Sequence, residues 1–423
     1  YDFSTGALLS ATGFNNETTT YSYNDPLDRL TTETRPTGFG KTDYIYSAPG
    51  VFPATVQIRT QLQGSDFITS TSYFDGTLNL IRQERTDAGT GGVVITETRY
   101  DALGRAVRVS NPRRTIAAET DGWTRTTYDA IGRVTSISNC ADESQTQDCT
   151  GTVTSEYAGA QVTITDQQGK QRRSISDALG RLRKVFEPDA AGALTLLTQY
   201  QYDARSNLRT AIQGTQARSF EYDSLGRLTS ATNPENGTVV YSYDQASNLI
   251  SRTDARNITT NYDYDELNRV VSKSYSDDTP AVTYLYDKQS GIPINVGSAL
   301  GRLVGVMSGN GADAVGTFYG YDLGGRIVRG SQLLDGRLYQ STVDYNEASL
   351  PIEEAFLPTS AVVQTSYNAV GQIDSVTRNG AILSTNTSYT ATGALNSQRL
   401  GNNLLHSITY NHRLQPKTIA LGS

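Results

Sequence analysis

Alternating apolar and polar residues over short stretches predict that the chain consists of β-strands. Residues 238–243 are typical, because Val239, Tyr241 and Tyr243 occupy every second position and would share one strand face. The turn-forming cluster 233–237 precedes them, and residues 228–232 predict a partner strand. Thr, Val, Ile and Tyr dominate such stretches and no 3.6-residue periodicity persists. We therefore predict an all-β fold and not a helical repeat.

One short motif recurs and sets the spacing of these strands. It reads tyrosine, Asp, two variable residues, Gly, Arg and an aliphatic residue, and copies at positions 202, 222, 243, 264 and 286 lie 20 to 22 residues apart. Each period has room for two strands of about six residues, which predicts hairpins that pair into one continuous antiparallel strip. Five copies supply the expected turn and strand residues: Tyr100, Asp101, Gly104, Arg105, Tyr128, Asp129, Gly132, Arg133, Tyr222, Asp223, Gly226, Arg227, Tyr264, Asp265, Asn268, Arg269, Tyr321, Asp322, Gly325 and Arg326.

Each motif residue type suits a tight turn. The Asp side chain can accept backbone N–H bonds at the start of the turn, and Gly can take the positive-φ position that closes it. Asn268 replaces Gly with the next best tolerated residue, whereas Ser206 and Ser247 predict weaker turns. The Arg four positions after each Asp predicts an Asp–Arg contact across the turn. An anion-binding ladder of these arginines is the disfavoured alternative, because the net charge is −7.

Composition and charge exclude several classes of function. Lys and Arg number 36 against 43 Asp and Glu, so no basic surplus is present for nucleic acid, and no apolar run approaches the 18 residues of a membrane span. The only histidines are His406 and His412, and no nucleophile-elbow string surrounds a plausible serine. The motif aspartates are separated by whole repeats, which favours turn capping over convergence on a metal ion. We expect no catalytic, cofactor or metal site.

Cys140 and Cys149 flank a polar, acidic stretch and are the only cysteines. We predict that they form a disulfide, which would close a ten-residue loop and suit an oxidising, extracellular setting. Two unpaired thiols are the alternative. A metal pair is disfavoured because no second Cys pair or nearby His completes a site.

These motifs resemble those of the YD-repeat or RHS-repeat family, which includes bacterial polymorphic-toxin RHS proteins, shell components of insecticidal toxin complexes and the YD region of teneurins. The resemblance runs from Tyr1 to about Tyr410 and is clearest over residues 100–134 and 176–270. It implies a long β-strip that spirals into a hollow shell, commonly around a C-terminal toxin segment of the same polypeptide. Roughly 40 strands at about 4.8 Å would give a path of about 190 Å, enough for about one turn of a wall roughly 60 Å across.

We expect residues 1–423 to form a single strip with irregular insertions near 48–92, 140–150 and 288–300. The last of these would split one motif between Tyr286-Asp287 and Gly301-Arg302. The chain begins inside a motif, ends inside a repeat and lacks the family's self-cleavage core. We therefore expect it to be a fragment of a longer polypeptide.

The leading hypothesis is a non-enzymatic wall of a secreted or cell-surface bacterial protein, with a toxin or effector segment of the same polypeptide as its partner. The alternative is an adhesin or carbohydrate-binding module whose exposed tyrosines stack on cell-surface glycans. Packing of the tyrosines between neighbouring strands is favoured over that alternative.

Overall fold

The computed structural model describes residues 1–87, 92–144, 149–288, 291–309 and 313–422. Over these ranges it contains 35 β-strands and no α-helix. Parts of the three expected insertions, residues 88–91, 145–148 and 289–290, lie outside the described residues. The predicted all-β fold is confirmed.

The strands are short and follow one another with few long connections. The first twelve are β1 (Ser10–Thr12), β2 (Thr18–Ser22), β3 (Thr32–Thr34), β4 (Lys41–Tyr46), β5 (Ala54–Gln63), β6 (Asp66–Phe74), β7 (Leu80–Thr86), β8 (Val93–Tyr100), β9 (Ala106–Ser110), β10 (Trp123–Tyr128), β11 (Val134–Cys140) and β12 (Thr150–Ala158). The next twelve are β13 (Gln161–Thr165), β14 (Gln171–Ser176), β15 (Leu182–Pro188), β16 (Leu194–Tyr202), β17 (Leu208–Gln213), β18 (Gln216–Tyr222), β19 (Leu228–Asn233), β20 (Gly237–Tyr243), β21 (Leu249–Thr253), β22 (Thr259–Tyr264), β23 (Val270–Tyr275) and β24 (Val282–Tyr286). The last eleven are β25 (Leu303–Ser308), β26 (Val315–Tyr321), β27 (Ile327–Leu334), β28 (Arg337–Tyr345), β29 (Pro351–Leu357), β30 (Ala361–Tyr367), β31 (Ile373–Arg378), β32 (Ala381–Tyr389), β33 (Leu395–Leu400), β34 (Leu405–Tyr410) and β35 (Pro416–Gly422).

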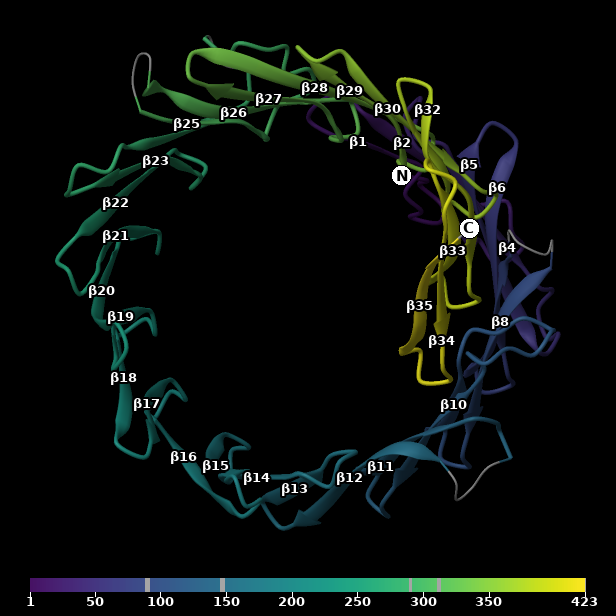
Figure 1. Ribbon diagram of the computed structural model, residues 1–423, viewed down its shortest axis with the longest axis horizontal. Coiled ribbons are helices and arrows are strands. Elements are labelled where there is room, and N and C mark those ends of the chain that lie inside the picture. The colour runs from purple at the N-terminus through teal and green to yellow at the C-terminus, as the bar shows by residue number, and fades with distance from the viewer. Residues whose placement is uncertain (88–91, 145–148, 289–290, 310–312, 423) are drawn as a thin grey trace.

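Each strand pairs antiparallel with the next one along the chain, so the strands form a single open sheet. The strip runs once around a ring and then continues, so that β30–β35 return beside the first strands (Figure 1). We call residues 1–286 the first coil and residues 300–422 the second coil. The path therefore exceeds the single turn expected from strand counting.

The connections between strands alternate between two edges of the strip. One edge carries the turns of the tyrosine-aspartate motif, for example residues 101–105, 129–133, 223–227 and 322–326, and we call it the motif rim. The other carries connections such as 13–17, 36–40, 64–65, 111–122 and 166–170, and we call it the opposite rim. Because hairpins alternate, every motif turn lies on the same rim all the way round.

The wall has two unlike faces. In β20 the side chains of Val239, Tyr241 and Tyr243 are buried or half-buried, while those of Thr238, Val240 and Ser242 are exposed. β22 shows the same alternation. The side chains that are almost wholly buried include Val185, Val304 and Phe318. The wall is thus a single layer stabilised mainly by cross-strand contacts, with local clusters in place of one central core.

Residues 54–86 correct one expectation, because they are not an irregular insertion. They form β5, β6 and β7, which continue the strip in regular register. The motif is hard to recognise there because the glycine of the Asp75 turn follows the aspartate directly, as Gly76. Leu78 therefore occupies the positive-φ position of the turn (φ 64°).

The 288–300 segment does interrupt a motif. Its described residues pack Val296 and Ala299 against Val304, with Leu285 and Tyr321 alongside. The two halves of the split motif still meet, since the Asp287 amide donates to the Arg302 carbonyl at 2.9 Å and the Gly301 amide donates to Asp287 Oδ1 at 2.5 Å. The two ends of the inserted loop are therefore held together by hydrogen bonds between the halves of the motif.

Candidate functional site: the repeated turns and the seam between coils

The Asp101 turn shows how one motif closes. Asp101 Oδ1 accepts the amides of Leu103 and Arg105 at 2.9 and 3.0 Å, and Oδ2 accepts Arg105 Nε at 2.7 Å. Gly104 lies at φ 74°, and the register between Tyr100 and Ala106 shifts by a β-bulge. The turn is thus a type I-like turn with a glycine bulge, tied by one carboxylate.

The same arginine also reaches the next hairpin. Arg105 Nη1 donates to the carbonyl of Asp129 at 3.2 Å, and its guanidinium carbon lies 4.7 Å from the Tyr128 ring centroid. Tyr128 in turn donates its hydroxyl to the Ala106 carbonyl at 2.8 Å. One motif therefore closes its own turn and fastens the following one.

This arrangement recurs around the strip. The Arg Nε to Asp Oδ2 distance is 2.6 to 2.8 Å in the turns that begin at Asp101, Asp129, Asp177, Asp223, Asp265 and Asp322. Motif tyrosine hydroxyls that donate to a carbonyl of the preceding hairpin are those of Tyr100, Tyr128, Tyr202, Tyr243, Tyr264, Tyr321, Tyr345, Tyr367, Tyr389 and Tyr410. These tyrosines hold neighbouring strands together, as packing between strands predicts, and do not form a free stacking platform.

Substitutions within the motif keep the same geometry. Asn268, Ser206 and Ser247 occupy the glycine position at φ 59°, 69° and 68°. The serine turns are formed like the others, with the Ser206 amide donating to the Asp203 carbonyl at 3.1 Å. They carry the strain of a non-glycine residue at positive φ.

Hydrogen bonding shifts the acidity of the turn aspartates. The pKa of Asp101 lies below its usual value because Arg105 donates first through its backbone and then through its side chain. Asp223 and Asp265 show the same lowered pKa with the same leading cause. For Asp25 the bond from the Arg29 side chain lowers the pKa to about 2. The turns that begin at Asp25, Asp101, Asp223 and Asp265 are therefore held by ionised carboxylates at neutral pH.

A seam joins the two coils, with the motif rim of the second coil seated on the opposite rim of the first. Asn15 Nδ2 donates to the Leu300 carbonyl at 3.2 Å, and the Leu300 amide donates back to Asn15 Oδ1 at 3.1 Å. The Ala348 amide donates to the Leu62 carbonyl at 3.3 Å. These partners are 285 and 286 residues apart, so one circuit of the ring takes roughly that length of chain.

Charged and amide side chains extend the seam. Asn111 Nδ2 donates to the His412 carbonyl at 2.8 Å, and Arg114 donates to the Tyr389 carbonyl at 3.1 Å while pairing with Asp87 at 2.7 Å. Asp87 is only 6% exposed. Since a buried carboxylate is costly unless paired, this pair fixes Arg114 where the second coil needs a donor.

Phe39 forms the apolar part of the seam and is 7% exposed. The Arg326 guanidinium lies 3.9 Å from its ring centroid, with Tyr345 at 4.8 Å from the same guanidinium. The backbone of Gly324 lies so close to Phe39 that a Cβ there would fall 2.2 Å from the ring. Glycine at position 324 is therefore required by the approach of the two coils.

The two cysteines belong to the first coil and lie near the second, and the two histidines belong to the second coil. Cys140 and Cys149 form a disulfide with sulfurs 1.99 Å apart, between β11 and β12 on the opposite rim. His412 Nε2 lies 3.0 Å from Thr150 Oγ1, directly after that loop, and His406 Nδ1 lies 3.4 Å from Gln398. The two histidines thus have hydrogen-bond partners in the wall and the seam.

Among the residues that the structure describes, no group of three His, Cys, Asp or Glu side chains could hold a metal ion. No helix in the same ranges is long and apolar enough to cross a membrane. Asp263 accepts the Ser272 hydroxyl at 2.5 Å and Asp265 caps its turn, so this acidic pair is used locally.

Sequence reasoning identified the turns but missed the seam. Phe39, Asn111 and Arg114 lie in connections that carry no motif, and nothing in the local sequence marks their partners nearly 300 residues away. One signal was available, because Gly324 stands where other turns have an exposed Leu or Ile.

Comparison with protein families finds the RHS Repeat at residues 222–257 and 243–280, two overlapping matches within the regular part of the strip. Residues 222–280 of the chain thus carry RHS repeats. A search of characterised sequences found no match for it.

Solved toxin-complex structures share the fold of this chain. TcdB2-TccC3 superposes with a TM-score of 0.81 at 14% identity, covering 100% of this chain and 26% of the other. TcdB2-TccC3 without its hypervariable C-terminal region gives 0.82 at 12% identity, covering 100% and 28%. The Tc holotoxin pore of Photorhabdus luminescens gives 0.71 at 13% identity, covering 88% and 21%. The chain thus spans about a quarter of the length of the proteins whose fold it shares.

Proposed function

We propose that this chain is a non-enzymatic structural segment of a shell, and that the shell keeps a toxin or effector segment of the same polypeptide away from solvent and proteases. The observation that carries the proposal is the seam: a single strip passes its own start and seats one rim on the other. A wall built this way surrounds an interior, and hydrogen bonds join its two coils along the overlap.

Other features support the same function. The motif side chains close turns and tie hairpins, so they serve the wall and leave no group poised for chemistry. The Cys140–Cys149 disulfide suits a secreted or cell-surface protein, because such bonds persist in oxidising surroundings. The fold shared with TcdB2-TccC3 fits a shell within a larger toxin assembly.

The test is protease protection in the full-length parent protein. Replacing Gly324→Leu restores the residue type common in other motif turns, yet its side chain would collide with Phe39 and wedge the coils apart. We expect wild-type protein to yield cleavage sites only outside the enclosed segment, and the variant to yield new sites within it, as mapped by mass spectrometry.

Ala246→Leu is the matched control, because Ala246 occupies the equivalent turn position on an uncovered part of the motif rim and is exposed. This variant should leave the cleavage map unchanged. Equal cleavage of every segment in wild type and Gly324→Leu protein, or a parent protein with no polypeptide inside the ring, would overturn the proposal.

A further inference from the structure

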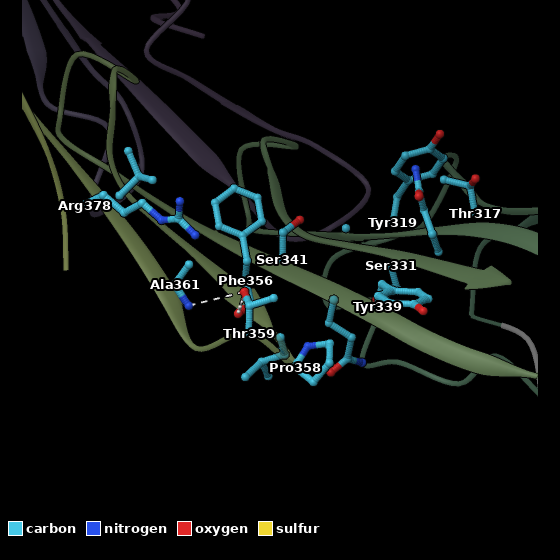
Figure 2. A pocket seen from close by; sticks show the side chains of 15 residues that line it. Thr317, Tyr319, Ser331, Tyr339, Ser341, Phe356, Pro358, Thr359, Ala361 and Arg378 are labelled. Atoms are coloured by element: carbon cyan, nitrogen blue, oxygen red, sulfur yellow. Dashed lines mark hydrogen bonds between the residues drawn. The ribbon is translucent and has the colours of Figure 1, made fainter. Parts of the chain in front are cut away.

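A cleft of about 780 Å³ lies on one face of strands β26 to β31 (Figure 2). A cross-strand row forms its centre: Tyr319 pairs with Gly330, Gly330 with Ser341, and Ser341 with Phe356. Residues directly opposite one another share a sheet face. Two small residues therefore lie between two large rings, and the hollow follows from that order.

Gly330 distinguishes this hairpin from those at Tyr241 and Tyr262. In the hairpins at Tyr241 and Tyr262, the residue opposite the tyrosine is Arg252 and Lys273, respectively. Their long side chains occupy the surface that is bare here. A Cβ added at Gly330 would lie 3.0 Å from Ser341 Oγ, so even the smallest side chain would begin to fill the floor.

The residues that line the cleft are uncharged except for one cation, Arg378. Tyr339 and Phe356 are 42% and 38% exposed, so their rings present apolar surface to an occupant. Arg378 lies at one end, while Thr317 and Tyr319 lie at the other (Figure 2). No Asp or Glu lines the cleft among the described residues, and within them the Arg378 guanidinium has no hydrogen bond or ion pair. An apolar surface that ends in an unpaired cation suits an amphipathic anion.

We propose that this cleft binds an aromatic carboxylate. The ring lies over Ser341 beside Gly330, between Tyr319 and Phe356, where stacked or edge-on packing buries apolar surface on both sides. The carboxylate pairs with Arg378, whose planar fork matches two carboxylate oxygens. A free small molecule and a polypeptide with a phenylalanine next to an acidic group offer the same chemistry.

The test uses the intact chain and N-acetylphenylalanine, with binding followed by ligand-observed NMR and calorimetry. We expect saturable binding that weakens about tenfold for N-acetylphenylalaninamide, which lacks the carboxylate. Gly330→Val should abolish saturable binding. Arg378→Gln should bind the acid and the amide equally well. Because this substitution leaves the floor of the cleft intact, it tests the proposal even if Gly330→Val fails to fold.

Arg172→Gln, which removes a 61% exposed cation on a distant hairpin, is the control and should bind like wild type. An internal Phe-Asp peptide that binds more tightly than N-acetylphenylalanine identifies a polypeptide source, and the reverse identifies a free small molecule. Equal binding of acid and amide to wild-type protein, or binding unchanged in Arg378→Gln, would overturn the proposal.

Discussion

The arc β13–β23 and the overlap of the two coils contain the same kind of turn, but the turn has a different role in each region. In the arc, the third residue of each motif turn projects from an uncovered rim, and Leu179, Leu225 and Leu267 are 72%, 71% and 69% exposed. In the overlap, the same position holds Gly324 and Ala348, which approach the first coil closely. The turn itself is unchanged. The small side chains at these two positions therefore let the second coil approach the first closely.

The largest effect should come from removing the apolar centre of the seam. Phe39→Ala should cost about 3–4 kcal/mol of docking free energy, because it leaves a cavity beneath Arg326. Native-state hydrogen exchange at the Ala348 amide, which donates across the seam, measures that loss locally.

Phe220→Ala in the arc is the matched control, since Phe220 is half-buried on a single-layer wall. Its effect should remain confined to β18 and its neighbours, and the Ala348 amide should keep its protection. Equal loss of protection in both variants would mean that the two regions unfold as one unit and would remove the basis of the comparison.

The next effect concerns the loop that precedes Thr150 at the seam. Replacing both Cys140→Ser and Cys149→Ser should destabilise the β11–β12 region by about 2.5–3 kcal/mol, because the unfolded chain regains the entropy of a ten-residue loop. Urea unfolding of the double variant, followed by the fluorescence of nearby Trp123, checks this expectation. An unchanged midpoint would contradict it.

Much of the arc could be predicted from sequence, because its determinants are local. Asp223 and Gly226 lie three residues apart, and the period of about 21 residues determines where the next hairpin begins. The overlap could not be predicted in this way. Phe39 and Arg326 contact each other only because the accumulated curvature of the strip returns it to its start, and curvature is not encoded in any single repeat. The role of Gly330 could not be predicted from the sequence either, because it depends on which residues pair with one another across three strands.

A smaller effect should distinguish a turn carboxylate in the arc from one in the overlap. Asp223→Ala removes the acceptor for the Leu225 and Arg227 amides, which should exchange about tenfold faster. Protection elsewhere should change only in the next hairpin, where Arg227 donates to the Asp244 carbonyl.

Asp322→Ala should instead also loosen the seam, because it releases Arg326 from the turn that holds it over Phe39. Hydrogen exchange at Ala348 distinguishes the two variants. If both leave Ala348 protected, Arg326 does not depend on its carboxylate for docking.

Acid should weaken the Asp turns near the start of the first coil. The pKa of Asp25 is lowered from 3.8 to about 2 by the Arg29 side chain, and that of Asp75 to about 2 by the Thr77 hydroxyl. A group whose pKa is lower in the folded state stabilises it above pH 3.8, and this contribution is lost as the pH falls toward 2. The melting temperature should therefore stay level from pH 7 to about 5 and decline below about 4. Asp25→Asn should be less stable at pH 7 and show a shallower decline.

The smallest expected effect is the most informative about the free rim. Leu225→Ala removes a 71% exposed side chain and should change the free energy of unfolding by no more than about 0.5 kcal/mol, because little apolar surface is released. Urea unfolding of the isolated chain measures it. A loss well above that value would mean that the leucine is covered in solution. The rim of the arc would then be docked like that of the overlap, and the comparison between the two regions would fail.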